Sequence, residues 1–125
     1  MKEKGTYIHH FSIMAPSNVI ERTMQFYRDV IGVAPGYRPK FSLPGYWLYS
    51  GDNPIIHLTA KDDKDQGIPG YLHHIALRCT NIDGLLGKLT EANIEYRKQD
   101  LNDVGQVQVT VLDPAGNLVE LNFEQ

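Results

Sequence analysis

The strongest constraint on this chain is an internal repeat that divides it into two halves. The segment 9–14 (HHFSIM) recurs as 73–78 (HHIALR), and the segment around His57 recurs around Glu120 at almost the same offset. Because a half of about 60 residues does not bury an adequate core alone, the repeat predicts two similar modules packed into one domain. Equivalent positions of duplicated modules are related by a pseudo-twofold axis, so residues far apart in the sequence are expected to meet there.

Each half is predicted to fold in the order βαβββ. In the first half, alternating residues over 8–14 indicate a strand, Ser17 is the expected N-cap of a helix, and Gly32 is its expected end. In the second half, the strand begins at 74, Asn81 takes the place of Ser17, and the helix ends near Asn93. Further strands are expected at 37–41, 46–50, 55–60, 95–98, 106–112 and 118–124. The predicted fold class is α+β. It is a single domain over 1–125, with one module at about 5–60, a linker at about 61–70 and the other module at about 71–125.

The alternation of side chains along four strands separates an apolar face from a face with metal-binding residues. Successive side chains of a strand point to opposite faces. In each of these strands one face is apolar, as a covering helix requires, and the other carries one residue of a type that binds metals. These residues are His10, His57, His74 and Glu120, and they are predicted to share one face of the sheet. His9 and His73 have the opposite parity and are expected at strand starts near the rim of the sheet; a role as ligands is the alternative.

Composition and charge disfavour several classes of function. The formal net charge is −3 and Lys and Arg form no long run, which disfavours nucleic acid as the main partner. The single cysteine, Cys79, permits no intramolecular disulfide, and its position on the apolar face predicts a buried side chain rather than a nucleophile. We find no signal-peptide pattern and no apolar run of membrane-spanning length. The expectation is a cytoplasmic protein without a membrane partner.

Several segments, taken together, resemble the vicinal oxygen chelate superfamily, which is also called the glyoxalase/bleomycin-resistance/extradiol-dioxygenase superfamily. They are 10–13 (HFSI), 26–32 (FYRDVIG), 57–58 (HL), 74–77 (HIAL) and 113–121 (DPAGNLVEL). The resemblance covers essentially the whole chain. Its most specific parts are the end of the first helix (FYRDVIG) and the late DPAG turn. It implies tandem βαβββ modules that close a cup-shaped mixed β-sheet around a divalent metal, with helices on the convex face, in a homodimer.

The resemblance also implies a set of metal ligands. His10, His57, His74 and Glu120 stand at the ligand positions of the metal-dependent members, and His57 replaces a glutamate of bacterial glyoxalase I. Three imidazoles and one carboxylate suit Zn, Ni, Fe or Mn. If the modules are swapped between two chains, His10 and His57 of one subunit share the metal with His74 and Glu120 of the other. Pairing within one chain is the alternative. The competing interpretation of these four residues is a wet cleft without a metal.

Further residues are candidates for contact with a small-molecule substrate. Arg78 has the same parity as His74, where it either clamps a carboxylate or phosphate or forms a salt bridge at the rim. In the aromatic-rich segment 38–49, Arg38 is expected to meet an anion, while Trp47 and Tyr49 wall a pocket; ordinary packing is the alternative for Trp47. Gln108 and Asn122 lie on strand faces expected to line the cup.

Three functions compete. The favoured one is a metal-dependent lyase or isomerase, in which the metal acts as a Lewis acid on vicinal oxygens and Glu120 moves a proton. The second is an Fe(II) extradiol-type dioxygenase. Four protein ligands disfavour it, because they leave two coordination positions open, whereas substrate and O₂ together need three. The third is a drug- or metabolite-binding protein of the bleomycin-resistance type, which needs a pocket and no metal; the retained ligand residues disfavour it.

Overall fold

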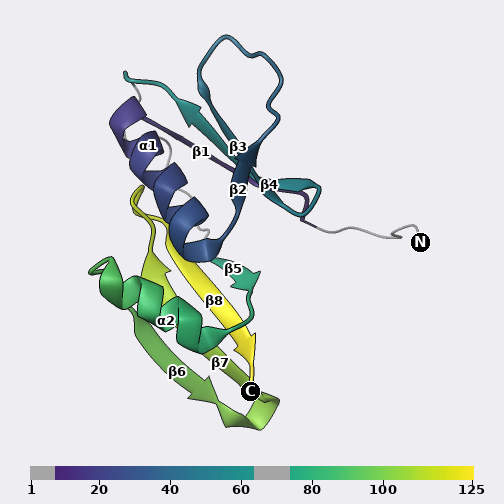
Figure 1. Ribbon diagram of the computed structural model, residues 1–125, viewed down its shortest axis with the longest axis vertical. Coiled ribbons are helices and arrows are strands. Elements are labelled where there is room, and N and C mark those ends of the chain that lie inside the picture. The colour runs from purple at the N-terminus through teal and green to yellow at the C-terminus, as the bar shows by residue number, and fades with distance from the viewer. Residues whose placement is uncertain (1–7, 64–73) are drawn as a thin grey trace, which may run out of the picture.

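The computed structural model describes residues 8–63 and 74–125, which form two βαβββ modules (Figure 1). The first contains β1 (Phe11–Ala15), α1 (Ser17–Phe26), the π-helical turn η1 (Tyr27–Ile31), β2 (Ala34–Gly36), β3 (Gly45–Ser50) and β4 (Asn53–Ala60). The second contains β5 (Ile75–Arg78), α2 (Ile82–Glu91), β6 (Arg97–Leu101), the 3₁₀ turn η2 (Asn102–Val104), β7 (Gln106–Leu112) and β8 (Leu118–Glu124). The predicted α+β class and the duplicated order are confirmed; most of the predicted linker lies outside the described residues.

Each module builds its own four-stranded mixed sheet. The strand orders are β1-β4-β3-β2 and β5-β8-β7-β6, and in both sheets the first strand runs parallel to the last. The two registers are equivalent, because Ser12 pairs with His57 in the first sheet and Ala76 pairs with Glu120 in the second. Over the described residues no strand pairing joins the two sheets, so β1 and β5 are edge strands.

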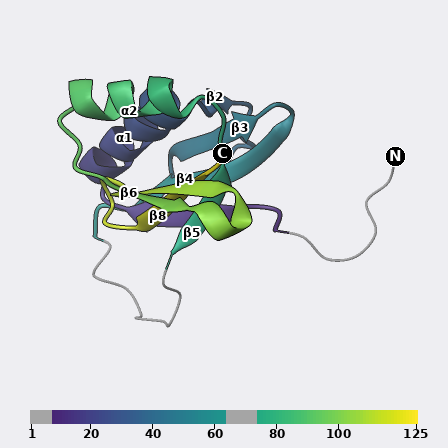
Figure 2. The same ribbon diagram turned by 90° about the horizontal axis from the view of Figure 1, so that it is seen from below.

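Both helices lie on the same side of the sheets (Figure 2), and the apolar strand faces lie beneath them. In β4, Ile56 and Leu58 are fully buried, whereas His57 and Thr59 between and after them are partly exposed on the opposite face. The same alternation runs along β8, where Val119, Leu121 and Phe123 are buried. Burial of alternate side chains therefore agrees with the faces predicted from parity. The opposite, wetter face is the one that carries the candidate ligands.

A buried hydrogen bond links the two modules. The Tyr27 hydroxyl donates to Asp113 Oδ2 at 2.7 Å, across 86 residues of sequence. Neither residue is appreciably exposed, at 0% for Tyr27 and 4% for Asp113. Burial, together with the Asp113 carboxylate, raises the pKa of Tyr27, so its hydroxyl stays protonated and donates. The bond joins the two most specific motifs of the sequence, the end of the first helix and the DPAG turn.

Two local predictions are wrong. Ser17 is not the N-cap of α1: the cap residue is Pro16, and the Ser17 backbone N–H donates to Asp62 Oδ1 at 2.7 Å instead. A carboxylate 45 residues away therefore satisfies this helix end. The strand predicted at 37–41 is also wrong, because β2 lies at Ala34–Gly36, paired with β3, and the segment after it is a loop. Asn81 and Gly32 are confirmed as the cap of α2 and the left-handed end of the first helix, respectively.

Candidate functional site

The second sheet brings a histidine and a carboxylate together. Glu120 lies in the middle of β8, and His74 lies directly before β5, which pairs with β8. His74 Nε2 is 3.3 Å from Glu120 Oε1. The Glu120 side chain is 17% exposed and that of His74 is 40% exposed, so the pair is open to solvent on one side. Parallel pairing of β5 with β8 thus places the two predicted ligands side by side.

Glu120 is held on its other side by an amide. Asn122 Nδ2 lies 3.4 Å from Glu120 Oε2 and 3.1 Å from Gln106 Oε1, which orients the carboxylate. The two candidate ligands line a cavity of about 600 Å³ together with Arg97, Lys98, Gln99, Thr110 and Leu118. Sequence reasoning missed Arg97. Its pairing with Thr110, which pairs in turn with Glu120, would have placed it on the same face.

The first sheet builds a different arrangement at the equivalent place. The ring of His57 is sandwiched: His10 stacks on it with centroids 3.7 Å apart and Trp47 with centroids 4.1 Å apart. His57 Nε2 is 3.1 Å from the Pro54 carbonyl oxygen, which makes this nitrogen the N–H donor of the neutral ring. Burial and the neighbouring His10 lower the pKa of His57. The ring is therefore neutral at neutral pH.

The four predicted ligands lie as two pairs within one chain. Among the described residues, no three His, Cys, Asp or Glu side chains come close enough to hold a metal ion together. His10 and His57 form one pair on the first sheet, and His74 and Glu120 form the other on the second. His9 Nδ1 lies 2.9 Å from His10 Nδ1, whereas His73 lies outside the described residues.

The two pairs differ in how well they fit a metal. Two ligands at 2.0–2.2 Å from a tetrahedral ion are about 3.3–3.6 Å apart. The 3.3 Å between His74 Nε2 and Glu120 Oε1 matches this separation. Imidazole nitrogens bind metals in the plane of the ring, and the planes of His10 and His57 are 12° from parallel, so their lone pairs do not converge. The separation of His74 and Glu120 therefore matches that of two ligands of one ion, whereas His57 as oriented does not fit one jointly with His10.

The family model described as the Glyoxalase/Bleomycin resistance protein/Dioxygenase superfamily matches residues 7–121. The chain belongs to this superfamily. Among solved structures, a glyoxalase family protein from Bacillus anthracis is similar, with 24% identity, a TM-score of 0.75 and coverage of 100% of both chains. No curated protein sequence matches this superfamily member.

Two other similar structures carry more specific descriptions. A lactoylglutathione lyase from Agrobacterium tumefaciens is 19% identical over 97% of this chain and 96% of its own, with a TM-score of 0.66. TnmS3, an antibiotic binding protein from Streptomyces sp. CB03234, is 21% identical over 99% and 100%, with a TM-score of 0.67. At these identities the likeness shows that the superfamily member shares the fold, and it does not separate catalysis from binding.

The remaining predicted contact residues of this superfamily member are distributed over the molecule. Arg38 and Trp47 line a cavity of about 250 Å³ on the first sheet. The Tyr49 hydroxyl donates to the Tyr37 carbonyl at 2.7 Å, and its ring packs against Gly36. Gln108 pairs with Asn122 across β7 and β8, and neither lines the cavities on the two sheets. Over the part of the chain that is described, no helix has the length and apolarity to cross a bilayer.

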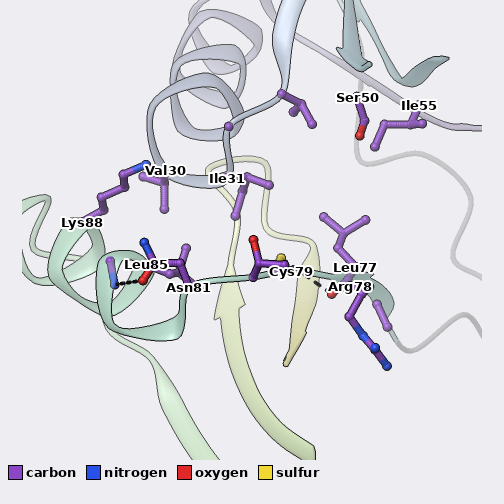
Figure 3. A pocket seen from close by; sticks show the side chains of 15 residues that line it. Val30, Ile31, Ser50, Ile55, Leu77, Arg78, Cys79, Asn81, Leu85 and Lys88 are labelled. Atoms are coloured by element: carbon purple, nitrogen blue, oxygen red, sulfur yellow. Dashed lines mark hydrogen bonds between the residues drawn. The ribbon is translucent and has the colours of Figure 1, made fainter. Parts of the chain in front are cut away.

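A groove of about 470 Å³ lies between the modules of this superfamily member (Figure 3). Val30 and Ile31 of the first helix face Leu85 of α2 and Cys79 across it. The Arg78 side chain extends away from the centre of the groove, and its Nη1 donates to Glu124 Oε1 at 2.9 Å. Of the two alternatives for Arg78, the contact present in the structure is the exposed ion pair.

Replacing Cys79 with Ser is expected to leave metal content unchanged and to change the free energy of unfolding by less than about 1 kcal/mol. The thiol is partly buried, its Sγ lies 3.8 Å from the Leu77 carbonyl, and burial raises its pKa, so the thiolate is scarce. Elemental analysis and urea unfolding of both proteins measure the two quantities. Loss of bound metal from a variant with unchanged stability would contradict the assignment of Cys79 as a packing residue.

Proposed function

We propose that this protein is a metal-dependent enzyme that acts on a small substrate with vicinal oxygens, in a lyase or isomerase reaction. The observation that carries the proposal is the 3.3 Å approach of His74 Nε2 to Glu120 Oε1 on the open face of the second sheet. A cavity of about 600 Å³ adjoins this pair, which is large enough for a small-molecule substrate. An imidazole and a carboxylate suit Zn, Ni, Fe or Mn.

We propose further that two copies of the chain complete the site as a homodimer. Within one chain His10 does not join His74 and Glu120, yet it holds the equivalent position in the first module. A second copy that places the edge strand β1 beside β5 brings its His10 to the pair around the pseudo-twofold axis. Two identical sites then form at one symmetric interface, as closed dimers require.

The chain's own residues then divide the work of the reaction. His74 and Glu120 would hold the divalent ion, which would supply Lewis-acid stabilisation of negative charge on the substrate oxygens. Asn122 holds Glu120 Oε2, so the carboxylate keeps one orientation from which it takes a proton from the substrate and returns it. Arg97 and Lys98 line the same cavity and attract an anionic substrate to it.

Complementation between two inactive variants tests the shared site. Neither His10→Ala nor Glu120→Gln is expected to bind metal tightly alone. In a mixed dimer, His10 of the Glu120→Gln chain meets intact His74 and Glu120 of the other chain, so one site per dimer is restored. Elemental analysis of the co-refolded mixture is expected to regain up to half of the heterodimers' two sites. If heterodimers form and bound metal is not recovered, the site is not shared between chains.

One observation favours a second candidate, an Fe(II) extradiol-type dioxygenase. His57 is stacked between His10 and Trp47 and bonded to the Pro54 carbonyl, so the fitting ligands reduce to His10, His74 and Glu120. Two histidines and one carboxylate leave three positions open, the number that a catechol and O₂ need. Iron in the purified protein, with O₂ consumed on adding catechol, would support this candidate over the isomerase. Absence of any bound metal, also after reconstitution, would favour a small-molecule binding protein; TnmS3, a similar structure, is an antibiotic binding protein.

A further inference from the structure

The first sheet carries a pocket whose described lining has a positive charge and no negative one. The cavity of about 250 Å³ lies between the loop that joins β2 to β3 and the open face of the sheet. Ser12, Trp47, His57 and Thr59 form its floor, and Arg38 and Phe41 reach it from the loop. Its lining contains no carboxylate, so the positive charge of Arg38 is unopposed.

Arg38 is held in position by its surroundings rather than by an acid. Its Cζ lies 4.8 Å from the centroid of the Phe41 ring, and a Cβ placed at Gly45 would lie 3.1 Å from its Nη2. Gly45 also has no room for a side chain because the Leu58 carbonyl is in the way. The guanidinium therefore lies beside Gly45, where no side chain fits, and against the Phe41 ring.

Nothing in the described part of the chain satisfies this guanidinium. Arg38 Nε is buried and has no hydrogen-bond partner, and no carboxylate of residues 8–63 or 74–125 forms an ion pair with Arg38. A buried donor on a charged group is costly to leave unpaired, and native proteins rarely do so without a functional reason. An anion from outside the chain would supply the partner that this donor lacks.

We propose that this pocket binds the carboxylate of a small acid with a flat, unsaturated or aromatic body, and that Arg38 is its specificity-determining residue. The planar fork of arginine matches the two oxygens of a carboxylate. Trp47 and Phe41, with centroids 6.1 Å apart, offer aromatic faces to the body of the ligand. A volume below the roughly 300–1,000 Å³ of drug-sized sites selects a small acid. Binding of the acid is independent of the proposed function; only its role as the substrate rests on the proposed function.

Trp47 is the single tryptophan of the chain, so its fluorescence reports on this pocket alone. The experiment titrates the metal-free, full-length protein in EDTA with benzoate, benzyl alcohol and phenyl phosphate. Saturable quenching by benzoate is expected, with benzyl alcohol binding at least about 10-fold more weakly because it lacks the charge. Phenyl phosphate binding more tightly than benzoate would overturn the choice of a carboxylate in favour of a phosphate.

Variants assign the effect to one side chain. Arg38→Met keeps an apolar stem over Phe41 and is expected to abolish the preference for benzoate over benzyl alcohol. Arg38→Lys keeps the charge without the fork and is expected to bind benzoate more weakly than the native chain. Arg22→Met is the matched control, because Arg22 is exposed on α1, away from the cavity. Equal benzoate affinity in Arg38→Met and the native protein would overturn the proposal.

Metal content measured on the same preparations keeps this inference separate from the proposed function. Metal bound normally by Arg38→Met, together with lost benzoate preference, supports both. Metal bound without any saturable effect of benzoate overturns the pocket and leaves the enzyme proposal standing. Benzoate bound through Arg38 without any metal binding supports the pocket and contradicts the metal-dependent enzyme.

Discussion

Replacing Glu120 with Gln is expected to lower the affinity for the bound metal by at least about 100-fold while leaving the fold intact. The amide keeps the size of the side chain but loses the negative charge that offsets a divalent cation, and a neutral amide is a poor ligand beside imidazole. The Glu120 side chain is mostly covered, at 17% exposed, but Gln has nearly the same size and shape, so the change removes no packing. Equilibrium dialysis with Zn²⁺, followed by elemental analysis, measures the change.

Glu124→Gln provides the matched control for this experiment. Glu124 is the last residue of β8, on the same strand as Glu120, but it is exposed and paired with Arg78. Its substitution is expected to leave metal affinity within about twofold of the native value, since exposed ion pairs contribute little. If Glu120→Gln and His74→Ala both keep one metal per chain, the site assigned to the second sheet is wrong.

Replacing Asp113 with Ala is expected to destabilise the protein by about 2–4 kcal/mol. Asp113 Oδ1 accepts the backbone N–H groups of Ala115 and Asn117, and Oδ2 accepts the Tyr27 hydroxyl. Alanine leaves that hydroxyl buried without an acceptor, and it also removes the side-chain hydrogen bonds of the turn before β8, whose backbone hydrogen bonds remain. Urea unfolding measures the loss of stability. Both proteins are compared at the same concentration, because dimerisation would add to stability.

Tyr27→Phe separates the bond between the modules from the turn. It removes only the hydroxyl and is expected to cost about 1.5 kcal/mol, less than Asp113→Ala, because Asn117 and Ala115 still satisfy the carboxylate. Tyr46→Phe is the control: its hydroxyl donates to the exposed carboxylate of Glu21, and its loss is expected to cost less than about 0.5 kcal/mol. Equal effects of the two substitutions would contradict the role given to the buried bond.

Most of the fold could be predicted because the repeat and the strand parity report the same physical constraint. A strand with one covered face must alternate; β4 does so from Ile55 to Ala60, and β8 does so along its whole length. The turn at 113–117 and the left-handed Gly32 are also local features, determined by residues next to one another. These elements need no knowledge of distant contacts.

The errors arise where a distant residue decides the outcome. The Ser17 backbone is bonded by Asp62, which no pattern around Ser17 indicates. The segment 37–41 alternates as a strand does, but β2 pairs with β3 earlier in the chain, at Ala34–Gly36. The Tyr37 carbonyl then accepts a hydrogen bond from the Tyr49 hydroxyl rather than from the backbone of a neighbouring strand.

The candidate site shows the same limit. Parity placed His57 on the correct face, but it does not determine the rotamer of the side chain. Stacking between His10 and Trp47, together with the hydrogen bond to the Pro54 carbonyl, determines the orientation of the ring. Equivalence between the modules predicted that four residues meet. It does not say whether they meet in one chain or between two, and within one chain they form two pairs. Their convergence and their role as ligands stay predictions.

The buried bond between Tyr27 and Asp113 has a consequence for the ancestry of the chain. In the register of the repeat, Glu91 stands in the second half where Tyr27 stands in the first, and Ser50 stands in the first half where Asp113 stands in the second. The repeat therefore does not supply this bond a second time. Two copies of the first half would bury two tyrosine hydroxyls without an acceptor, and two copies of the second would bury two carboxylates without that donor. At this contact the two halves are complementary, because each supplies the group that the other lacks.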